Sequence, residues 1–383
     1  MNILLQAVSV VPEILIFLVV IIVLVLVHEL GHLIVAKVSG MRVDEFGFGF
    51  PPRALTLGKM GETEITLNWI PLGGFVRIYG EDGVTGEGVT DTARAFSSRP
   101  RILQALVLLA GVAMNVLLAY VLIVGSLVVG NQQELEYGHE GTATHIHMAF
   151  AQVRPGSPAD KAGLKSGDIV TNSVIREGAL GIGYNGTNPV GLMTLIGTDA
   201  NLSPMIFSVE RNSKPLTITV VPEKNIIAGS PNQPAIGVSI VEIGIVKTPL
   251  LQSFTDGFTV LGNMTTSIAG GLYDLLKGIV TFKADLSQVA GPVGIVGIVG
   301  QATATGFGEL LSLTALVSIN LAIINLIPIP ALDGGRLLFV IIEAIIRRPL
   351  NAKIAERVNM VGFGLLLLLM FVVTAHDIFR LFQ

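Results

Sequence analysis

A long uncharged stretch near the N-terminus constrains this chain more than any other feature. Residues 14–27 carry no charge and residues 33–36 are apolar again, so the stretch is long enough to cross a bilayer as a helix. Between the two runs stands the motif His28-Glu29-Leu30-Gly31-His32, which places three ionisable side chains inside the predicted span. Each costs about 2.5–3.5 kcal/mol or more near the bilayer centre. Such residues need a partner, and a metal ion is the partner that suits them.

The spacing within this motif indicates a metal centre. Residues four positions apart lie on one face of a helix, so His28 and His32 can bind one ion together. Glu29 is offset by one position and can reach a water on that ion without binding the ion itself. This arrangement is typical of zinc peptidases, in which the glutamate is the general base. The alternative is a chance motif whose histidines only pack, and the desolvation cost inside an apolar span disfavours it.

The composition excludes several classes of protein. Of the 383 residues 51% are hydrophobic and only 14% are charged, whereas soluble globular proteins carry roughly 25% charged residues. The chain is therefore predicted to be an integral membrane protein with a soluble portion. A net charge of -4 gives no reason to propose nucleic-acid binding. Cysteine is absent, which excludes disulfides and thiolate metal sites.

About four segments approach or exceed the ~20 residues that a helical span requires. They are residues 12–36, residues 102–129, a segment that begins near 311 and is interrupted by Pro328 and Pro330, and residues 358–374. Lysine and arginine gather between the first two spans and again between the last two. Both of these loops are therefore predicted to be cytoplasmic, and both termini and the long segment 130–309 extracytoplasmic.

The loop after the first span has a β pattern. Residues 54–57 and 63–67 alternate between apolar and polar side chains, with Gly58 and Gly61 between them, which predicts a β-hairpin. Glycine and aromatic residues surround the hairpin, so we expect it to associate with the membrane, where protein or a bound peptide must cover its backbone. A cytoplasmic hairpin packed on the helix ends is the alternative.

The long extracytoplasmic segment contains a second signature. Residues 155–159 (PGSPA) and 162–168 (AGLKSGD) resemble a PDZ domain of the bacterial kind, spanning about residues 145–223. PDZ domains bind peptides by adding a strand to a sheet edge, and a module that only restricts access sterically is equally compatible with the pattern. Residues 254–282 are mildly amphipathic and are predicted to lie on the outer membrane surface.

The metal centre needs at least one more ligand, because catalytic zinc usually has three protein ligands and one open position. The candidate is Asp333, a carboxylate embedded in apolar sequence just after Pro328 and Pro330 break the helix. At ~1.5 Å per residue, His28 lies about 21 Å into the bilayer from the outside, and the broken stretch lies level with it. An Asp333 that only caps a helix is the alternative.

The motif HELGH, the PDZ-like module and residues 325–336 (NLIPIPALDGGR) together resemble the site-2 proteases, and more narrowly the bacterial regulator-of-sigma-E protease type. The resemblance covers nearly the whole chain. It implies that Asn325 helps to hold the substrate beside the zinc and that the hairpin near Leu55 and Leu67 pairs with it as an added strand. Residues 111–115 (GVAMN) resemble the family's G-P-x-x-N motif, with valine in place of proline.

We therefore predict a polytopic α-helical membrane protein with a membrane-associated β-hairpin segment and an inserted extracytoplasmic PDZ-like α+β domain. The predicted parts are residues 1–40 (first transmembrane helix), 41–100 (hairpin segment), 101–130 (second helix), 138–226 (PDZ-like domain), 227–310 (linker with an amphipathic helix), 311–346 (third transmembrane segment) and 347–383 (fourth helix).

The predicted function is zinc-dependent cleavage of single-span membrane proteins within the bilayer of a bacterial inner membrane, with the active site towards the cytoplasm. A zinc ion at His28, His32 and Asp333 would polarise the scissile carbonyl and lower the pKa of a bound water, whose proton Glu29 takes and passes to the leaving nitrogen. By resemblance, the substrates include anti-sigma factors already shortened by another protease and remnant signal peptides. The resemblance to PDZ domains also implies a peptide as a further partner, bound by the PDZ-like domain.

Two other classes of function compete with this one. A metal transporter would need a continuous polar path, and the outer halves of the spans offer no ionisable residues for it. An inactive scaffold would show a damaged motif, whereas both histidines, Glu29 and Asp333 are present.

Overall fold

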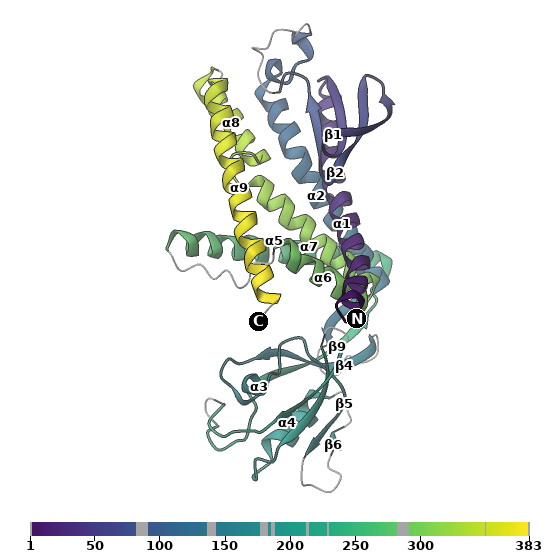
Figure 1. Ribbon diagram of the computed structural model, residues 1–383, viewed down its shortest axis with the longest axis vertical. Helices are drawn as coiled ribbons and strands as arrows, with labels where there is room; N and C mark the ends of the chain where they lie inside the picture. The colour runs from purple at the N-terminus through teal and green to yellow at the C-terminus, as the bar shows by residue number, and fades with distance from the viewer. Residues whose placement is uncertain are drawn as a thin grey trace. The chain divides into compact units, whose positions relative to one another are not determined.

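Four helices in the described part of the chain are long and apolar enough to cross a membrane. They are α1 (Asn2–Val38, counted from Val11), α2 (Arg101–Val129), α7 (Phe307–Leu326) and α9 (Ala352–Leu381) (Figure 1). The computed structural model describes residues 2–81, 91–135, 143–176, 183–184, 188–211, 214–227, 230–281, 291–348 and 350–381. By length and composition, these helices agree with the predicted spans.

The chain divides into two compact units. The first comprises residues 1–125, 254–302 and 310–383, and it contains most of the length of the long apolar helices. The second comprises residues 126–253 and 303–309 and is built around a β-sheet. The first unit therefore carries the metal-binding motif, and the second contains the region predicted to be a separate domain.

The predicted third span is two helices. α7 ends at Leu326, and α8 (Asp333–Ile346) begins at Asp333, so residues 327–332 separate the two helices. The break coincides with Pro328 and Pro330, because proline has no backbone N–H to continue a helix. As a result Asp333 stands in the first turn of a helix, immediately after an irregular stretch.

Two further helices follow β9 (Val238–Val246) in the sequence and precede α7. α5 (Leu250–Val280) covers the predicted amphipathic stretch, of which Phe282 lies outside the described residues. α6 (Pro292–Thr305) was not predicted, and its 14 residues are fewer than the ~20 that a span needs. Asp377 of α9 accepts a hydrogen bond from Gly294 N (2.8 Å) in the first turn of α6.

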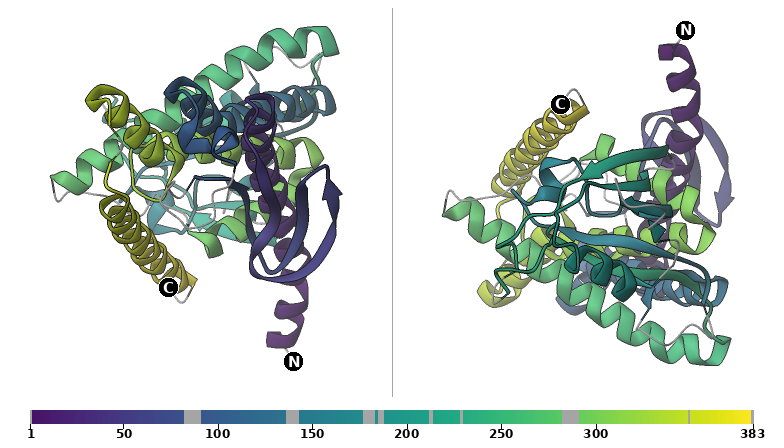
Figure 2. Two further views of the ribbon diagram at one scale, coloured as in Figure 1. Left: turned by 90° about the horizontal axis from the view of Figure 1, so that it is seen from above. Right: turned by 90° about the horizontal axis from the view of Figure 1, so that it is seen from below.

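The predicted hairpin is present and is longer than expected. β1 (Val43–Met60) and β2 (Thr63–Ile78) pair antiparallel, with Leu55 opposite Leu67. Residues 43–48 pair with both ends of β2, whereas residues 53–60 pair only with residues 63–68. Among the described residues, the outer edge of 53–60 therefore has no strand partner. The sheet lies against one side of α1 (Figure 2).

A compact apolar core joins this sheet to the C-terminal half of α1. It contains Leu33 and Ala36 of α1, Phe46 of β1, Val107 of α2 and Val340 of α8. Because these residues come from four different elements, the core fixes the positions of the helices that carry the motif and Asp333.

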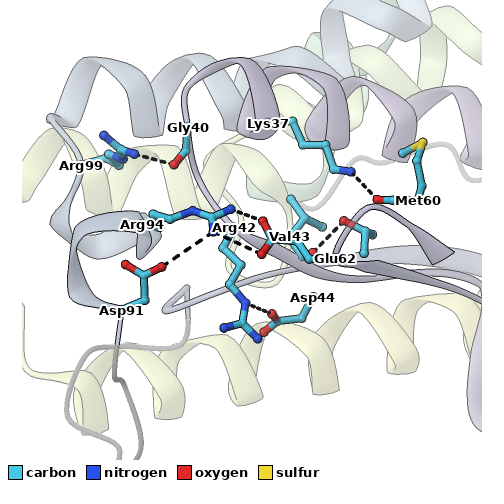
Figure 3. A network of polar contacts seen from close by, with 11 residues as sticks. Lys37, Gly40, Arg42, Val43, Asp44, Met60, Glu62, Asp91, Arg94 and Arg99 are labelled. Carbon is cyan, nitrogen blue, oxygen red and sulfur yellow. Dashed lines mark hydrogen bonds and ion pairs between the residues drawn. The ribbon is translucent and has the colours of Figure 1, made fainter.

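Polar contacts hold the end of α1 to the sheet and to the segment before α2 (Figure 3). Lys37 Nζ donates to Met60 O at 3.1 Å, and Arg99 donates to Gly40 O. Arg94 pairs with Glu62, and this hydrogen bond lowers the pKa of the Glu62 carboxyl. The turn between β1 and β2 is thus held by charged groups on two neighbouring segments.

The second unit is a seven-stranded sheet with the order β3-β9-β4-β5-β7-β8, in which β6 pairs with β5. The strands are β3 (Asn131–Leu135), β4 (Ala143–Val153), β5 (Ile169–Arg176), β6 (Gly183–Tyr184), β7 (Met205–Arg211), β8 (Lys214–Val220) and β9 (Val238–Val246). Two short helices, α3 (Pro158–Lys161) and α4 (Pro189–Gly197), complete it. β9 lies between β3 and β4, so the sheet extends beyond the predicted range of 138–226.

The aspartate of the AGLKSGD stretch has a structural role in this unit. Asp168 is fully buried and accepts hydrogen bonds from Arg211 Nε at 2.6 Å and from Lys165 N at 2.9 Å. Arg211 also donates to Gly163 O at 2.7 Å. The glycine-containing turn is therefore fixed to the end of β7. His145 and His147 are exposed, and His139 lies outside the described residues.

Candidate active site and metal centre

Three predicted ligands from two distant parts of the chain meet in the first unit. His28 Nε2 lies 2.9 Å from Asp333 Oδ2, and His32 Nε2 lies 3.3 Å from the same oxygen. The two Nε2 atoms are 3.2 Å apart, and ligand atoms of all three residues lie within 4.8 Å of one another. Two imidazoles and one carboxylate converging on one point form a donor set that suits zinc.

Asp333 does not act as a helix cap. The N-cap position of α8 is Leu332, and no side chain makes a capping hydrogen bond there. Instead the carboxylate faces the two histidines. Gly334 and Gly335 allow this, since a β-carbon at either position would lie 2.3 Å from a carbonyl oxygen of Ile327 or Ile329. The two glycines thus let the start of α8 fold tightly against the irregular stretch that precedes it.

Glycine also allows α1 and α2 to approach each other at the site. A β-carbon at Gly31 would lie 2.4 Å from Ala110 O, so the two backbones are in direct contact there. A β-carbon at Gly111 would lie 2.5 Å from His32 Nε2 and 2.6 Å from His28 Cε1. The imidazole rings therefore occupy the space that any other residue at position 111 would fill.

The outer nitrogens of both rings have partners on α2. His32 Nδ1 donates to Val107 O at 2.8 Å, which leaves Nε2 facing Asp333 as the ring atom that can bind a cation. His28 Nδ1 lies 3.2 Å from the carboxamide of Asn115. Metal-binding histidines commonly have such a second hydrogen bond, which orients the ring. The residues present therefore fit a zinc ion bound by His28, His32 and Asp333.

The comparison with protein families decides the identity. The model of peptidase family M50 matches residues 16–369, which include the motif and Asp333. This chain belongs to peptidase family M50, the site-2 proteases. Its M50 match covers both units apart from short terminal segments.

Relatives of this M50 protein are similar over almost their whole length. A Clostridium perfringens protein described as a candidate zinc metalloprotease is 36% identical over 356 residues, covering 93% of this chain and 95% of the relative. Zinc metalloprotease RasP of Oceanobacillus iheyensis is 30% identical, with 94% and 97% covered. The regulator of sigma-W protease RasP of Bacillus subtilis is 30% identical, with 94% and 96% covered. The M50 protein is a zinc metalloprotease.

The general base predicted for this M50 protease lies beside the sheet. Glu29 follows His28 on α1, and its side chain is half-buried. A β-carbon at Gly74 of β2 would lie 3.3 Å from Glu29 Cγ. The sheet therefore passes close to the Glu29 side chain at a point where β2 carries no side chain of its own.

The predicted substrate-binding residues lie on other elements. Asn325 is half-buried in the last turn of α7. Leu55 and Leu67 are paired on the hairpin and are 56% and 41% exposed. Among the described residues, the hydrogen bonds and ion pairs of the three ligands run to one another, to Val107 and to Asn115. The structure therefore brings the three proposed metal ligands together. The substrate-binding roles of Asn325, Leu55 and Leu67 remain predictions.

The second unit of this M50 protease contains a cavity of about 610 Å³. Met193 and Ile196 of α4 line one side, and Ser239 and Ile240 of β9 line another. Residues 238–240 of β9 lie next to β4, while β3 pairs with β9 only from Glu242 onward. The cavity thus lies along a part of β9 that has one strand neighbour among the described residues.

Proposed function

We propose that this M50 protease cleaves single-span membrane proteins within the bilayer, with zinc held by His28, His32 and Asp333. The observation that supports this most is the position of the donor set. Two ligands stand within a helix that is long and apolar enough to cross a membrane, and the third meets them from a break between apolar segments. A donor set on such a helix acts on peptide bonds that are themselves in or beside the bilayer.

The chain's own groups supply orientation and proton transfer. Zinc, when bound, supplies Lewis acidity towards the scissile carbonyl and the attacking water. Glu29 accepts the proton of that water on its carboxylate and delivers it to the leaving nitrogen. The asymmetry of the motif assigns these roles, because His28 and His32 share a helix face and Glu29 is offset from it.

We further propose that the open edge at residues 53–60 holds the substrate in an extended conformation. A helical peptide bond is shielded by its own backbone hydrogen bonds, so the substrate has to unwind before it is cut. An unpaired strand edge can replace the lost hydrogen bonds by adding the substrate as a further strand. The exposed apolar side chains of Phe50, Leu57 and Trp69 near this edge support contact with lipid or with an apolar substrate. Asn325 would hold the peptide beside the zinc.

The test of the mechanism separates chemistry from metal binding. Glu29→Gln should retain about one zinc per chain and lose cleavage of a model transmembrane substrate, because the amide cannot accept the proton. Glu134→Gln changes an exposed glutamate on β3 and serves as the matched control with unchanged activity. Full activity in Glu29→Gln would exclude Glu29 as the base, and loss of zinc would make it a ligand.

We propose that the protein resides in the bacterial cell membrane with both termini and the second unit outside, and that its substrates include shortened anti-sigma factors and remnant signal peptides. The basic residues of the segments 42–101 and 347–357 support this orientation. The natural chain has no cysteine, so single cysteines report sidedness directly. Ser166→Cys should react with a membrane-impermeant maleimide in intact spheroplasts, and Lys353→Cys should react only after the membrane is opened. The reverse pattern would invert the topology.

A further inference from the structure

The buried side-chain amide of Asn115 lies beside the metal centre and has no role in the mechanism proposed above. Asn115 of α2 is fully buried, and its carboxamide Nδ2 lies 3.2 Å from His28 Nδ1. Its main-chain carbonyl accepts a hydrogen bond from Ser318 Oγ of α7 at 2.8 Å, and Ser318 is itself fully buried. Asn115 is therefore held in place by a neighbouring helix while its side chain reaches a metal ligand.

The position of Asn115 on α2 follows from the helical repeat. Val107, Gly111 and Asn115 are spaced four residues apart, so they form one row along a single face of α2. Val107 O accepts from His32 Nδ1, Gly111 leaves room for both rings, and Asn115 meets His28 Nδ1. This row gives each histidine its own partner on the nitrogen that faces away from Asp333.

The hydrogen-bonding capacity of the amide is only partly used in this arrangement. Asn115 Oδ1 is buried and makes no hydrogen bond with any described residue. A buried acceptor left without a hydrogen bond destabilises the folded chain. A half-turn of the carboxamide exchanges Oδ1 and Nδ2, which brings the acceptor to His28 Nδ1.

The chemistry of a histidine ligand requires this acceptor. When Nε2 of a neutral imidazole binds a cation, the ring proton is on Nδ1, and Nδ1–H then needs an acceptor. Val107 O already satisfies this requirement for His32. We infer that Asn115 is a positioning residue whose Oδ1 accepts a hydrogen bond from His28 Nδ1–H and so fixes the ring with Nε2 directed at the metal. This inference rests on the proposed zinc site.

The experiment measures zinc affinity of the purified full chain in detergent by competition with a chromophoric chelator, and needs no substrate. Asn115→Leu has a similar volume and no acceptor, and it should weaken zinc binding about 10- to 100-fold, as the loss of such outer partners does in other zinc sites. Asn115→Asp keeps an acceptor oxygen and should hold zinc as tightly as the natural chain or more tightly. Ser126→Ala removes another buried polar group from α2 that bonds to Gly308 O, and it should leave zinc affinity unchanged.

The variants test the role of Asn115 and the zinc ligand set separately. Zinc affinity in Asn115→Leu equal to that of the natural chain would overturn the inference, and so would equal weakening in Asn115→Leu and Asn115→Asp. Either result leaves the zinc site itself intact. Asp333→Ala tests that site separately: if this variant binds zinc as tightly as the natural chain, the proposed ligand set is wrong, and the inference that rests on it falls as well.

Discussion

The α2 helix carries glycine at position 111, where it passes the two histidines of α1, and the lack of a side chain there is a requirement of the metal site. Any β-carbon at 111 would lie 2.5 Å from His32 Nε2. The rings cannot retreat easily, because Val107 O holds His32 and Asn115 holds His28. A side chain at 111 would therefore displace the two histidines that we propose as zinc ligands.

This predicts opposite outcomes for two glycine substitutions on one helix. Replacing a helical glycine with alanine ordinarily favours the helix by roughly 0.5–1 kcal/mol. Gly111→Ala should nevertheless lose zinc and activity, since its β-carbon overlaps the imidazoles. Gly125→Ala is the matched control, because its β-carbon would meet only Leu311 Cδ1 at 3.5 Å, an ordinary contact. Zinc content measured by atomic emission checks both, and zinc retention in Gly111→Ala would show that the rings can move.

The sequence alone predicts the metal ligands but not the residues of α2 that contact them. The motif and Asp333 carry ionisable side chains in apolar sequence, and that conflict is visible without a structure. Val107 contributes only a main-chain carbonyl, which no sequence pattern marks. The resemblance drew attention to Gly111 and Asn115 as a motif, but their function depends on which face of α2 meets α1. Only the packing of the helices supplies that information.

At the scale of elements, a buried carboxylate holds the sheet of β1 and β2 together. Glu45 of β1 is 4% exposed and pairs with Arg53 at 2.9 Å and with Arg77 at 3.0 Å. It also accepts a hydrogen bond from Thr66 Oγ1 at 2.7 Å. One side chain in the middle of the sheet thus connects the open-edge stretch 53–60 with the opposite end of β2.

We expect Glu45→Ala to loosen the open edge without emptying the metal site. Removing the acceptor of charged hydrogen bonds should lower the stability of the sheet by about 1.5–3 kcal/mol. Amide hydrogen exchange of residues 53–60 should accelerate, cleavage should slow, and zinc content should stay constant. Asp44→Ala, which removes a partner of Arg42 only, is the control. Unchanged exchange at the edge would mean that backbone pairing alone fixes it.

The elements that the sequence predicted only in part or not at all lack a regular local pattern. β1 contains repeated irregularities in register and two glycines before residue 50, which interrupt the alternation that marks a strand. α6 is apolar and shorter than a span, so it carries neither the length nor the periodicity of a recognisable element. β9 pairs with β3 and β4, which lie far away in the sequence. In contrast, the long spans are identified by length alone.

At the scale of the whole molecule, the second unit is an insertion with adjoining ends. Gly130 stands just before β3, and Lys247 stands just after β9. The two residues are neighbours in space, because a β-carbon at position 130 would lie 2.8 Å from Lys247 Cγ. The sheet between them has its own apolar core, in which the rings of Phe150 and Phe207 pack with centroids 5.7 Å apart. The unit can therefore be excised at these ends with a short bridge.

We propose that this unit is PDZ-like and selects substrates by size, and its removal tests that proposal. Deleting residues 131–246 with a two-residue glycine-serine bridge should leave cleavage of short substrates nearly intact and permit cleavage of some substrates that retain a bulky outer domain. A cut at 145–223 would leave β9 without β4 and is the poorer design. If the excised protein holds zinc but no longer cleaves short substrates, the unit is a docking site, and the cavity between α4 and β9 is the place to test for peptide binding.

The separation of the proposed ligands along the chain has a consequence for biosynthesis. His28 and Asp333 are 305 residues apart. At a synthesis rate of about 5–20 residues per second, roughly 15–60 seconds pass between translation of the HELGH helix and translation of the aspartate. During that interval the nascent chain has two histidines in the bilayer and an incomplete donor set. With the proposed ligand set, zinc-dependent cleavage therefore cannot begin before Asp333 has been synthesised and has joined the two histidines.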